Sequence, residues 1–260
     1  MLSIEEIKKQ YPSDFHKFER GILREYLQYL ILEIIFDTNI SSKLSFLGGT
    51  CLRIVHGIKR FSEDIDFDNK ELSIEEFTSL AKAIEKGLKL QGFDVETTVT
   101  KQKAIHCHVK FSNILFENNL SNIKGEKIDI QVDTFDQGYN YESELYLLNK
   151  FDVFKQIKIT PKSIILSQKL WTITQRNRVK GRDYYDIIYL LQNTIPDLGF
   201  LNLKLKTSNW DEAKLVILDS IKDIDLETAI KDVQPFLMNR EEGKKIQLFR
   251  EYLEQIEFDK

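Results

Sequence analysis

The chain is organised around residues Phe46 to Asp68, which read FLGGTCLRIVHGIKRFSEDIDFD. A short apolar strand enters two glycines, a brief helical segment and a basic turn follow, and a second strand carries Asp64 and Asp66. Residues two apart in a strand point to the same side, so both carboxylates are expected on one face. A glycine turn that opens a helix favours an anion, and paired carboxylates favour a divalent cation. The stretch therefore predicts a site for a metal ion and a phosphate.

The two carboxylates are the more specific part of this stretch. Ile65 and Phe67 alternate with them and are apolar, which indicates a strand whose other face is buried. Two like charges on one face are unfavourable unless a cation or a base neutralises them. The glycine pair is weaker support, because most such pairs only form a turn and the spacing of a Walker A loop is absent.

The composition is that of an ordinary folded protein. With 260 residues, 42% hydrophobic and 30% charged, the chain is long enough for one large domain or two smaller ones. The net charge of −4 excludes a globally basic nucleic-acid binder and leaves a local basic patch open. Two cysteines without a CxxC pair fit a reduced cytoplasmic protein without a zinc site. Since no apolar run reaches about 18 residues and no signal peptide is visible, we expect no membrane partner.

The remaining patterns divide the chain into two parts. Residues 1–40 show apolar residues at helical spacing, and a capping box of Ser73 and Glu76 predicts a helix that ends near Gly92. Strands are expected over residues 93–99, 104–116, 126–135 and 141–148. Beyond Pro161 we expect helices over residues 164–178, 183–191, 210–222, 225–237 and 242–257. The expected fold is therefore α+β, with an α/β-like core and a mixed sheet over residues 1–160 and a helical domain over residues 161–260 packed on it.

A further strand offers a third carboxylate. From Lys127 to Asp133 polar and apolar residues alternate, so Asp129 and Asp133 share one face. Either of them completes a metal site if this strand lies beside Asp64 and Asp66, and periodicity does not choose between them. A half-exposed strand with solvated acids explains this segment equally well. On the preceding strand, His106 and His108 share a face and are expected to be surface residues.

The segment from Lys150 to Asp186 is basic. It holds nine Lys or Arg against three Asp, a net of +6 in a chain whose total is −4. Such a segment suits a triphosphate or an RNA backbone. Lys169 and Arg176 are seven residues apart and share a helical face, while Asp183 and Asp186 share a face of the next helix. A solvated basic helix is the alternative explanation.

Two motifs together resemble the AbiEii/AbiGii toxin family of the nucleotidyltransferase superfamily. The first, GGT-x-L-x(7)-R-x-S-x-D-x-D, runs from Gly48 to Asp66, and the second, KL-x(5)-R-x(5)-RD-x-x-D, runs from Lys169 to Asp186. The KIDI segment at Lys127 corresponds to the place of the superfamily's third acid. The resemblance covers about residues 40–195.

The resemblance implies a polymerase-β-like nucleotidyltransferase core followed by a helical region. It also implies a role for each matching residue. Gly48, Gly49 and Thr50 would hold nucleotide phosphates, Asp64, Asp66 and Asp129 would bind two Mg²⁺ ions, Lys169 would contact the triphosphate, Asp183 or Asp186 would complete the site, and Arg60 and Ser62 would position the nucleotide.

Members of that family act as toxins of toxin–antitoxin or phage-defence pairs, and some transfer nucleotides to tRNA 3′ ends. The expected reaction is attack by an acceptor hydroxyl on the α-phosphorus of an NTP, with release of pyrophosphate. The expected partners are an NTP, tRNA or another RNA, and a cognate antitoxin. Three alternatives stay open: modification of a protein or small molecule, a non-enzymatic interaction module with one structural cation, and a metal nuclease. The nuclease would leave the glycine turn and Lys169 without a role.

Overall fold

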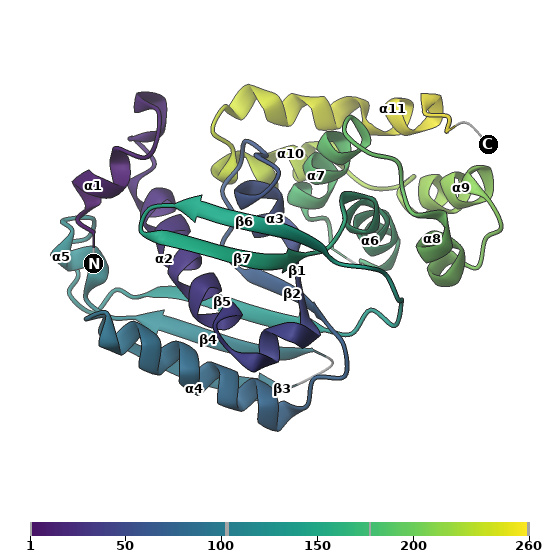
Figure 1. The fold of residues 1–260 in the computed structure, drawn as a ribbon. Helices are drawn as coiled ribbons and strands as arrows, with labels where there is room; N and C mark the ends of the chain where they lie inside the picture. Colours follow the sequence, from purple (N-terminus) through teal and green to yellow (C-terminus); the bar gives the residue numbers. More distant parts are fainter. Residues whose placement is uncertain (1, 102–103, 177, 259–260) are drawn as a thin grey trace. The chain divides into compact units, whose positions relative to one another are not determined.

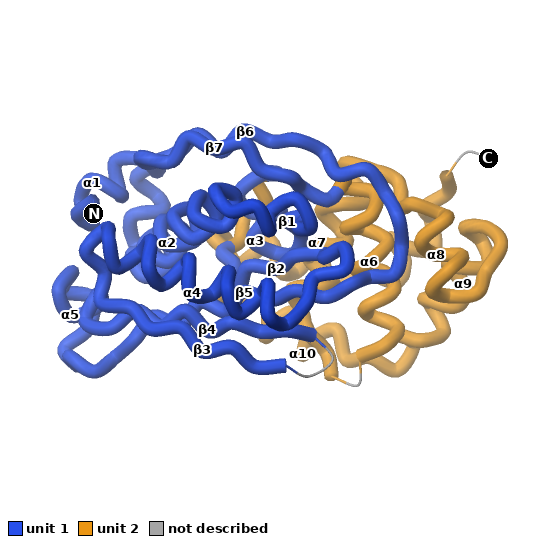
Figure 2. Tube along the Cα trace, turned by 60° about the horizontal axis from the view of Figure 1, so that its bottom comes forward, with its two compact units in different colours: residues 1–56, 61–160 blue, residues 57–60, 161–260 orange. Residues whose placement is uncertain are grey.

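The structure, a computed structural model, describes residues 2–101, 104–176 and 178–258. The chain forms two compact units (Figure 2). Unit 1 comprises residues 1–56 and 61–160, and unit 2 comprises residues 57–60 and 161–260. Gly57–Arg60, in the middle of the first motif, thus belong to the C-terminal unit. The sequence predicts a simple division at residue 160 and does not predict this exchange.

Unit 1 is built on a seven-stranded mixed sheet (Figure 1). The strand order is β3-β4-β5-β2-β1-β7-β6, with β2 parallel to β5 and β1 parallel to β7, while the other neighbours are antiparallel. This sheet confirms the expected α+β fold with a mixed sheet. The strands are β1 (Leu44–Leu47), β2 (Ile65–Asn69), β3 (Val95–Lys101), β4 (Ile105–Phe111), β5 (Ile128–Phe135), β6 (Glu144–Lys150) and β7 (Val153–Ile159).

One face of the sheet is apolar and packs against two long helices. Helices α2 (Glu19–Phe36) and α4 (Ile74–Leu90) contact strands on this face, where Ile65 and Val132 are fully buried. The opposite face, which we call the polar face, carries Asp66 and Asp133. Shorter helices complete unit 1: α1 (Ile4–Lys8), α3 (Gly48–Ile54), α5 (Ile114–Glu117) and the 3₁₀ helices Ser13–Phe15 and Asn39–Lys43.

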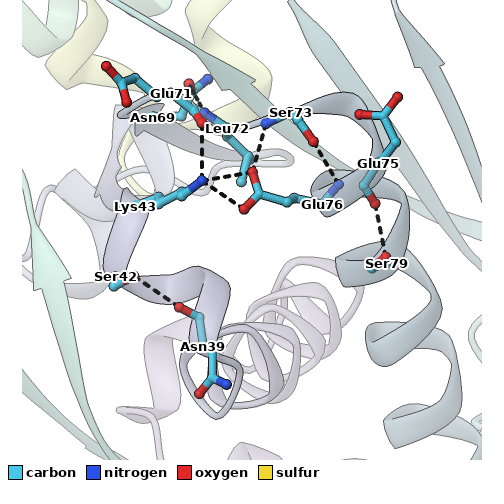
Figure 3. A network of polar contacts seen from close by, with 10 residues as sticks. All are labelled: Asn39, Ser42, Lys43, Asn69, Glu71, Leu72, Ser73, Glu75, Glu76 and Ser79. Carbon is cyan, nitrogen blue, oxygen red and sulfur yellow. Dashed lines mark hydrogen bonds and ion pairs between the residues drawn. The ribbon is translucent and has the colours of Figure 1, made fainter.

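The predicted capping box begins α4 (Figure 3). The Ser73 backbone N–H donates to Glu76 Oε2 at 2.9 Å, and the Glu76 N–H donates to Ser73 Oγ at 3.2 Å. Lys43 extends this cap, because its Nζ lies 2.7 Å from Glu76 Oε1 and donates to the Glu71 carbonyl at 3.2 Å. The start of α4 is therefore tied to the segment that leads into β1.

Three elements of unit 1 differ from the sequence predictions. The helical pattern over residues 1–40 is interrupted between Lys8 and Glu19. The strand predicted over 104–116 ends at Phe111, since Asn113 adopts a left-handed backbone with φ 62° and opens a one-turn helix. Strand β7 was not predicted, although Ile157 and Ile159 alternate with Gln156 and Lys158.

Unit 2 is helical apart from an isolated bridge between Arg60 and Leu237 within its described residues. Helix α8 was not predicted, because Pro196 and Gly199 indicate a break, yet Asp197 caps the helix by accepting from the Phe200 N–H. The helix predicted over residues 164–178 ends at Gln175, and residue 177 lies outside the described residues. The helices are α6 (Lys162–Gln175), α7 (Gly181–Leu191), α8 (Leu198–Leu205), α9 (Trp210–Ser220), α10 (Leu226–Val233), α11 (Phe249–Gln255) and the 3₁₀ helices Gln234–Phe236 and Arg240–Leu248.

Within the described ranges, no helix combines the length and the apolar character that crossing a bilayer requires.

Candidate active site

The glycine turn and the second acid of the first motif are in direct contact in unit 1. Gly48 starts α3 with φ +79°, and pairing of β1 with β2 sets Leu47 opposite Asp66. A Cβ added to Gly48 would lie 2.1 Å from Asp66 Oδ2, far inside van der Waals contact. Glycine is therefore required here both for the backbone conformation and for the space that the carboxylate occupies.

Asp64 is held to the same turn through its backbone. The hydroxyl of Thr50, which is fully buried, donates to the Asp64 carbonyl oxygen. Gln28 of α2 supports the preceding residues, donating to the carbonyl oxygens of Ser62 at 3.0 Å and Glu63 at 3.1 Å. Asp64 itself precedes β2 rather than lying in it, and its side chain has intermediate exposure. The glycine turn and the segment from Ser62 to Asp66 are thus held together by hydrogen bonds within unit 1.

The strand register bears on the third acid. Because β2 and β5 run parallel with Asp66 opposite Asp133, these two residues lie on adjacent strands about 4.8 Å apart and point to the same face. Asp129 lies four residues earlier on β5, roughly 13 Å from Asp133 along the strand. The structure therefore brings Asp133, and not Asp129, next to Asp66.

Two histidines of β4 contact the acids of β5 on the polar face. His106 Nδ1 lies 2.8 Å from Asp133 Oδ1, and His108 Nδ1 lies 3.0 Å from Asp129 Oδ2. Gln131 Nε2 also donates to Asp133, at 2.8 and 2.9 Å to the two oxygens. The side chains of His106 and Asp133 are each 24% exposed, so this pair is partly shielded from solvent. The histidines, predicted to be surface residues, thus hold the side chains of the candidate third acids.

A second acid on β2, Asp68, was not among the predicted site residues. It is 5% exposed and accepts hydrogen bonds from the Gln137 N–H at 3.0 Å and the Tyr141 hydroxyl at 2.8 Å. Burial raises the pKa of the Asp68 carboxyl above its usual range, against the effect of these two donors. The sequence contains a signal for Asp68, because it continues the alternation of Asp64 and Asp66. Its hydrogen bonds and burial are those of a structural residue.

The acids of unit 1 suit a hard divalent cation in their chemistry. Carboxylate oxygens are the ligands that Mg²⁺ prefers. Asp66 and Asp133 lie opposite each other on β2 and β5, and Asp64 comes directly before β2. Among the described residues, no group of three or more His, Cys, Asp or Glu side chains is already gathered around a point where a metal ion would fit. The chemistry of these donors fits such an ion.

The second motif forms a buried cluster of charges in unit 2. Arg60 makes a two-pronged ion pair with Asp186, with Nε–Oδ1 and Nη2–Oδ2 both at 2.6 Å. Lys169 Nζ lies 2.8 Å from Asp183 Oδ1 and 3.0 Å from Asp186 Oδ2, and Arg176 Nε lies 2.7 Å from Asp183 Oδ2. Arg60 is 1% and Asp186 0% exposed. Arg60 of the first motif is thus joined to the second motif, which explains why Gly57–Arg60 belongs to unit 2.

The charges of this cluster stabilise one another. Burial disfavours the charged Asp183, yet Lys169 and Arg176 hold the pKa of its carboxyl below the usual value. Burial likewise opposes the charge of Lys169, while Asp183 and Asp186 raise the pKa of its ammonium group. Three cations against two acids leave an excess of one positive charge, and the Lys169 side chain, 16% exposed, is more accessible than the side chains of the two acids.

A close approach of two helices explains the glycine of the second motif. A Cβ added to Gly181 would lie 1.8 Å from the Ala229 carbonyl oxygen of α10. The Gly181 N–H also donates to Asp232 Oδ2 at 2.8 Å. The start of α7, which carries Asp183 and Asp186, is therefore positioned by contact with α10.

The fold is similar to those of two solved bacterial proteins. A crystal structure of a protein from H. pylori, assigned provisionally to the nucleotidyltransferases by its description, matches with a TM-score of 0.56 at 20% identity, over 93% of this chain and 99% of its own. The structure of JHP933 from Helicobacter pylori matches with a TM-score of 0.53 at 18% identity, over 91% and 94%. At these identities the likeness concerns the fold.

The sequence family is more specific than the fold. The model of the family described as nucleotidyl transferase AbiEii toxin, type IV toxin–antitoxin system, matches residues 30–255. The chain therefore belongs to the AbiEii family, which confirms the resemblance read from its two motifs and implies a cognate antitoxin as a partner. No match was found among curated proteins.

Proposed function

We propose that this protein transfers a nucleotide from an NTP to an RNA acceptor, with the 3′ end of tRNA as the first candidate. The observation that carries the proposal is the contact between the Asp66 carboxylate and the backbone of Gly48. A turn that binds phosphate and an acid that binds a metal ion must meet for a nucleotide to be held by both. The contact of Gly48 with Asp66 in unit 1 supports these two roles. Membership in a nucleotidyl transferase family supports the same reaction class.

The residues of unit 1 then have distinct roles. Gly48 and Gly49 present backbone N–H groups without side chains to obstruct a phosphate, and Thr50 holds the Asp64 backbone in place. Asp64, Asp66 and Asp133 would hold Mg²⁺, which when bound neutralises the charge that develops on the leaving pyrophosphate. His106 and Gln131 orient the Asp133 carboxylate through their hydrogen bonds. Asp129 as the third acid stays a sequence prediction.

Unit 2 contributes positive charge. The excess cation of the cluster around Lys169 suits the triphosphate, while Asp183 and Asp186 keep the ammonium group protonated and in place. Arg60 and Ser62 are separated by one residue in the chain, and Ser62 lies two residues before Asp64. In the reaction, an acceptor hydroxyl forms a bond to the α-phosphorus and loses its proton, and the bond from that phosphorus to the pyrophosphate oxygen breaks.

The test is transfer of label to RNA. The protein is incubated with each α-³²P-labelled NTP, Mg²⁺ and total RNA, beside the variants Asp133→Asn and Asp129→Asn. We expect label in RNA, a loss of about 10²-fold or more in Asp133→Asn and a change of less than about threefold in Asp129→Asn, because only Asp133 lies beside Asp66. Label that enters protein or a small molecule but not RNA would overturn the proposed acceptor. Loss confined to Asp129→Asn would overturn the choice of the third acid.

A further inference from the structure

A groove in unit 1, away from both motifs in the sequence, is lined by lysines. It lies between α4 and the edge strand β3 and has a volume of about 920 Å³. Its lining includes Lys82, Lys86, Lys89 and Lys101, together with Glu85 and Thr97. Four cations against one acid give the groove a net charge of +3 in a chain whose total is −4. We propose that this groove binds the phosphate backbone of the RNA acceptor, an inference that rests on the proposed function.

The lysines of α4 are spaced along one side of the helix. Lys82, Lys86 and Lys89 stand at positions i, i+4 and i+7, so they share a face and span about 10 Å along the axis. All three are exposed, as is Lys101 at the end of β3. A span of this length covers two to three phosphates of an RNA strand. A row of lysines on one wall of a concave groove thus fits a linear polyanion better than a single small anion.

The one acid in the groove is already engaged. Glu85 Oε2 accepts hydrogen bonds from the Thr97 N–H at 2.9 Å and the Thr97 hydroxyl at 2.8 Å, and its other oxygen pairs with Lys89. The hydrogen bond from Lys89, followed by that from Thr97, lowers the pKa of the Glu85 carboxyl. Within the described residues, no ion pair joins an acid to Lys82, Lys86 or Lys101. Lys82 and Lys86 are therefore available for an external partner, while Lys101 also interacts with the charge of Glu75 on α4.

The rest of the groove suits a nucleic acid rather than a simple ion. β3 is an edge strand, hydrogen-bonded to β4 on one side. Apart from the Thr97 N–H, which donates to Glu85, the backbone N–H groups on its other side can bind ribose or phosphate oxygens. Leu90 is 79% exposed at the end of α4, and Val99 also lines the groove. Apolar surface beside a row of cations is what a ribose–phosphate chain with stacked bases can cover.

The proposal is tested by reversing two lysine charges on α4 and, as a control, two lysine charges outside the groove. The double variant Lys82→Glu/Lys86→Glu is compared with Lys124→Glu/Lys231→Glu, whose lysines are also exposed. Both variants change the net charge by the same amount. Dissociation constants for unfractionated tRNA are measured at several salt concentrations without NTP, with thermal melting as a check of folding.

We expect the groove variant to bind tRNA at least about tenfold more weakly at low salt. We also expect its slope of log K against log salt to be smaller by about 1.4–1.8, since two phosphate contacts are lost. The control variant should resemble the parent protein in both. Equal weakening by the two variants would show a general charge effect and overturn the proposal. Unchanged tRNA binding in the groove variant would also overturn the proposal. This holds even if binding of the groove variant to phosphatidylserine vesicles, measured in parallel, is weaker.

The experiments distinguish an error in the proposed RNA-binding groove from an error in the proposed reaction. The binding measurements are repeated in an Asp66→Asn background, in which no transfer is expected. If tRNA binds through the groove but no label enters RNA from any NTP, the groove stands and the reaction is wrong. If label enters RNA with the same KM in the parent protein and the groove variant, the reaction stands and the groove is wrong.

Discussion

The acids of the sheet and the acids of helix α7 are the same residue type in opposite surroundings. Asp64, Asp66 and Asp133 have intermediate exposure on unit 1. Asp183 and Asp186 of unit 2 are 3% and 0% exposed and pair with cations. The two clusters therefore differ in what they can do.

The difference indicates that the sheet acids can bind a ligand, while the acids of α7 stabilise the fold. A buried ion pair has already exchanged water for its partner, so removing one partner leaves an uncompensated charge and costs about 3–5 kcal/mol of stability. A half-exposed carboxylate can exchange its contacts for a ligand at little cost to the fold. Substitutions in the sheet should therefore lower activity, and substitutions in the helical cluster should lower stability first.

Asp66→Asn is the substitution with the largest expected effect. Nucleotide transfer should fall by about 10³-fold, equivalent to about 4 kcal/mol of transition-state stabilisation, because the amide cannot replace a carboxylate ligand. The thermal midpoint should stay within a few degrees of the parent value, since the side chain is partly exposed. Single-turnover transfer assays and melting curves measure the two. A variant that unfolds without losing specific activity would reverse the assignment of roles.

Asp186→Asn should lower the stability of the fold by about 3 kcal/mol or more, because Arg60 and Lys169 lose their shared partner inside the protein. Urea unfolding of this variant is compared with that of Arg60→Met/Asp186→Leu, which removes both members of the Arg60 pair. The double variant should be the more stable of the two. If both lose the same stability, the ion pair is not what makes the single substitution harmful.

Gly48→Ala should cost about 2–3 kcal/mol, because a positive φ disfavours alanine and the new Cβ would meet the Asp66 carboxylate. Gly57→Ala is a matched control, since Gly57 has a similar φ of +76° and no atom within 4 Å of the added Cβ. It should cost only about 1 kcal/mol. Transfer activity should fall in Gly48→Ala alone. Equal losses of stability would mean that the contact with Asp66 adds nothing.

Asp68→Asn should give the smallest effect, and one that depends on pH. Because burial raises the pKa of Asp68 in the folded state, its contribution to stability is fully present below the unfolded value of about 3.9 and is lost as the pH rises through the folded pKa. The stability of the variant relative to the parent should therefore increase from pH 4 to pH 7. Urea unfolding across this range measures the difference. A constant difference would indicate that Asp68 titrates alike in both states.

Sequence alone determined the parts of this protein that depend on local pattern. The short strand before the glycines, the capped start of α4 at Ser73 and the buried alternation of Ile65 and Phe67 all follow from spacing and residue type. Local hydrogen bonds and side-chain alternation carry this information, and the two spaced motifs were specific enough to indicate the family.

Tertiary structure decided whatever depends on contacts between distant segments. Strand register decides which acid of β5 lies beside Asp66. The sequence cannot decide this, because Asp129 and Asp133 are four residues apart and point to the same face of the strand. The transfer of Arg60 to unit 2 depends on a partner 126 residues away. The lysine groove joins a helix face to a strand end, so its charges are scattered in the sequence and form a groove only because β3 packs against α4.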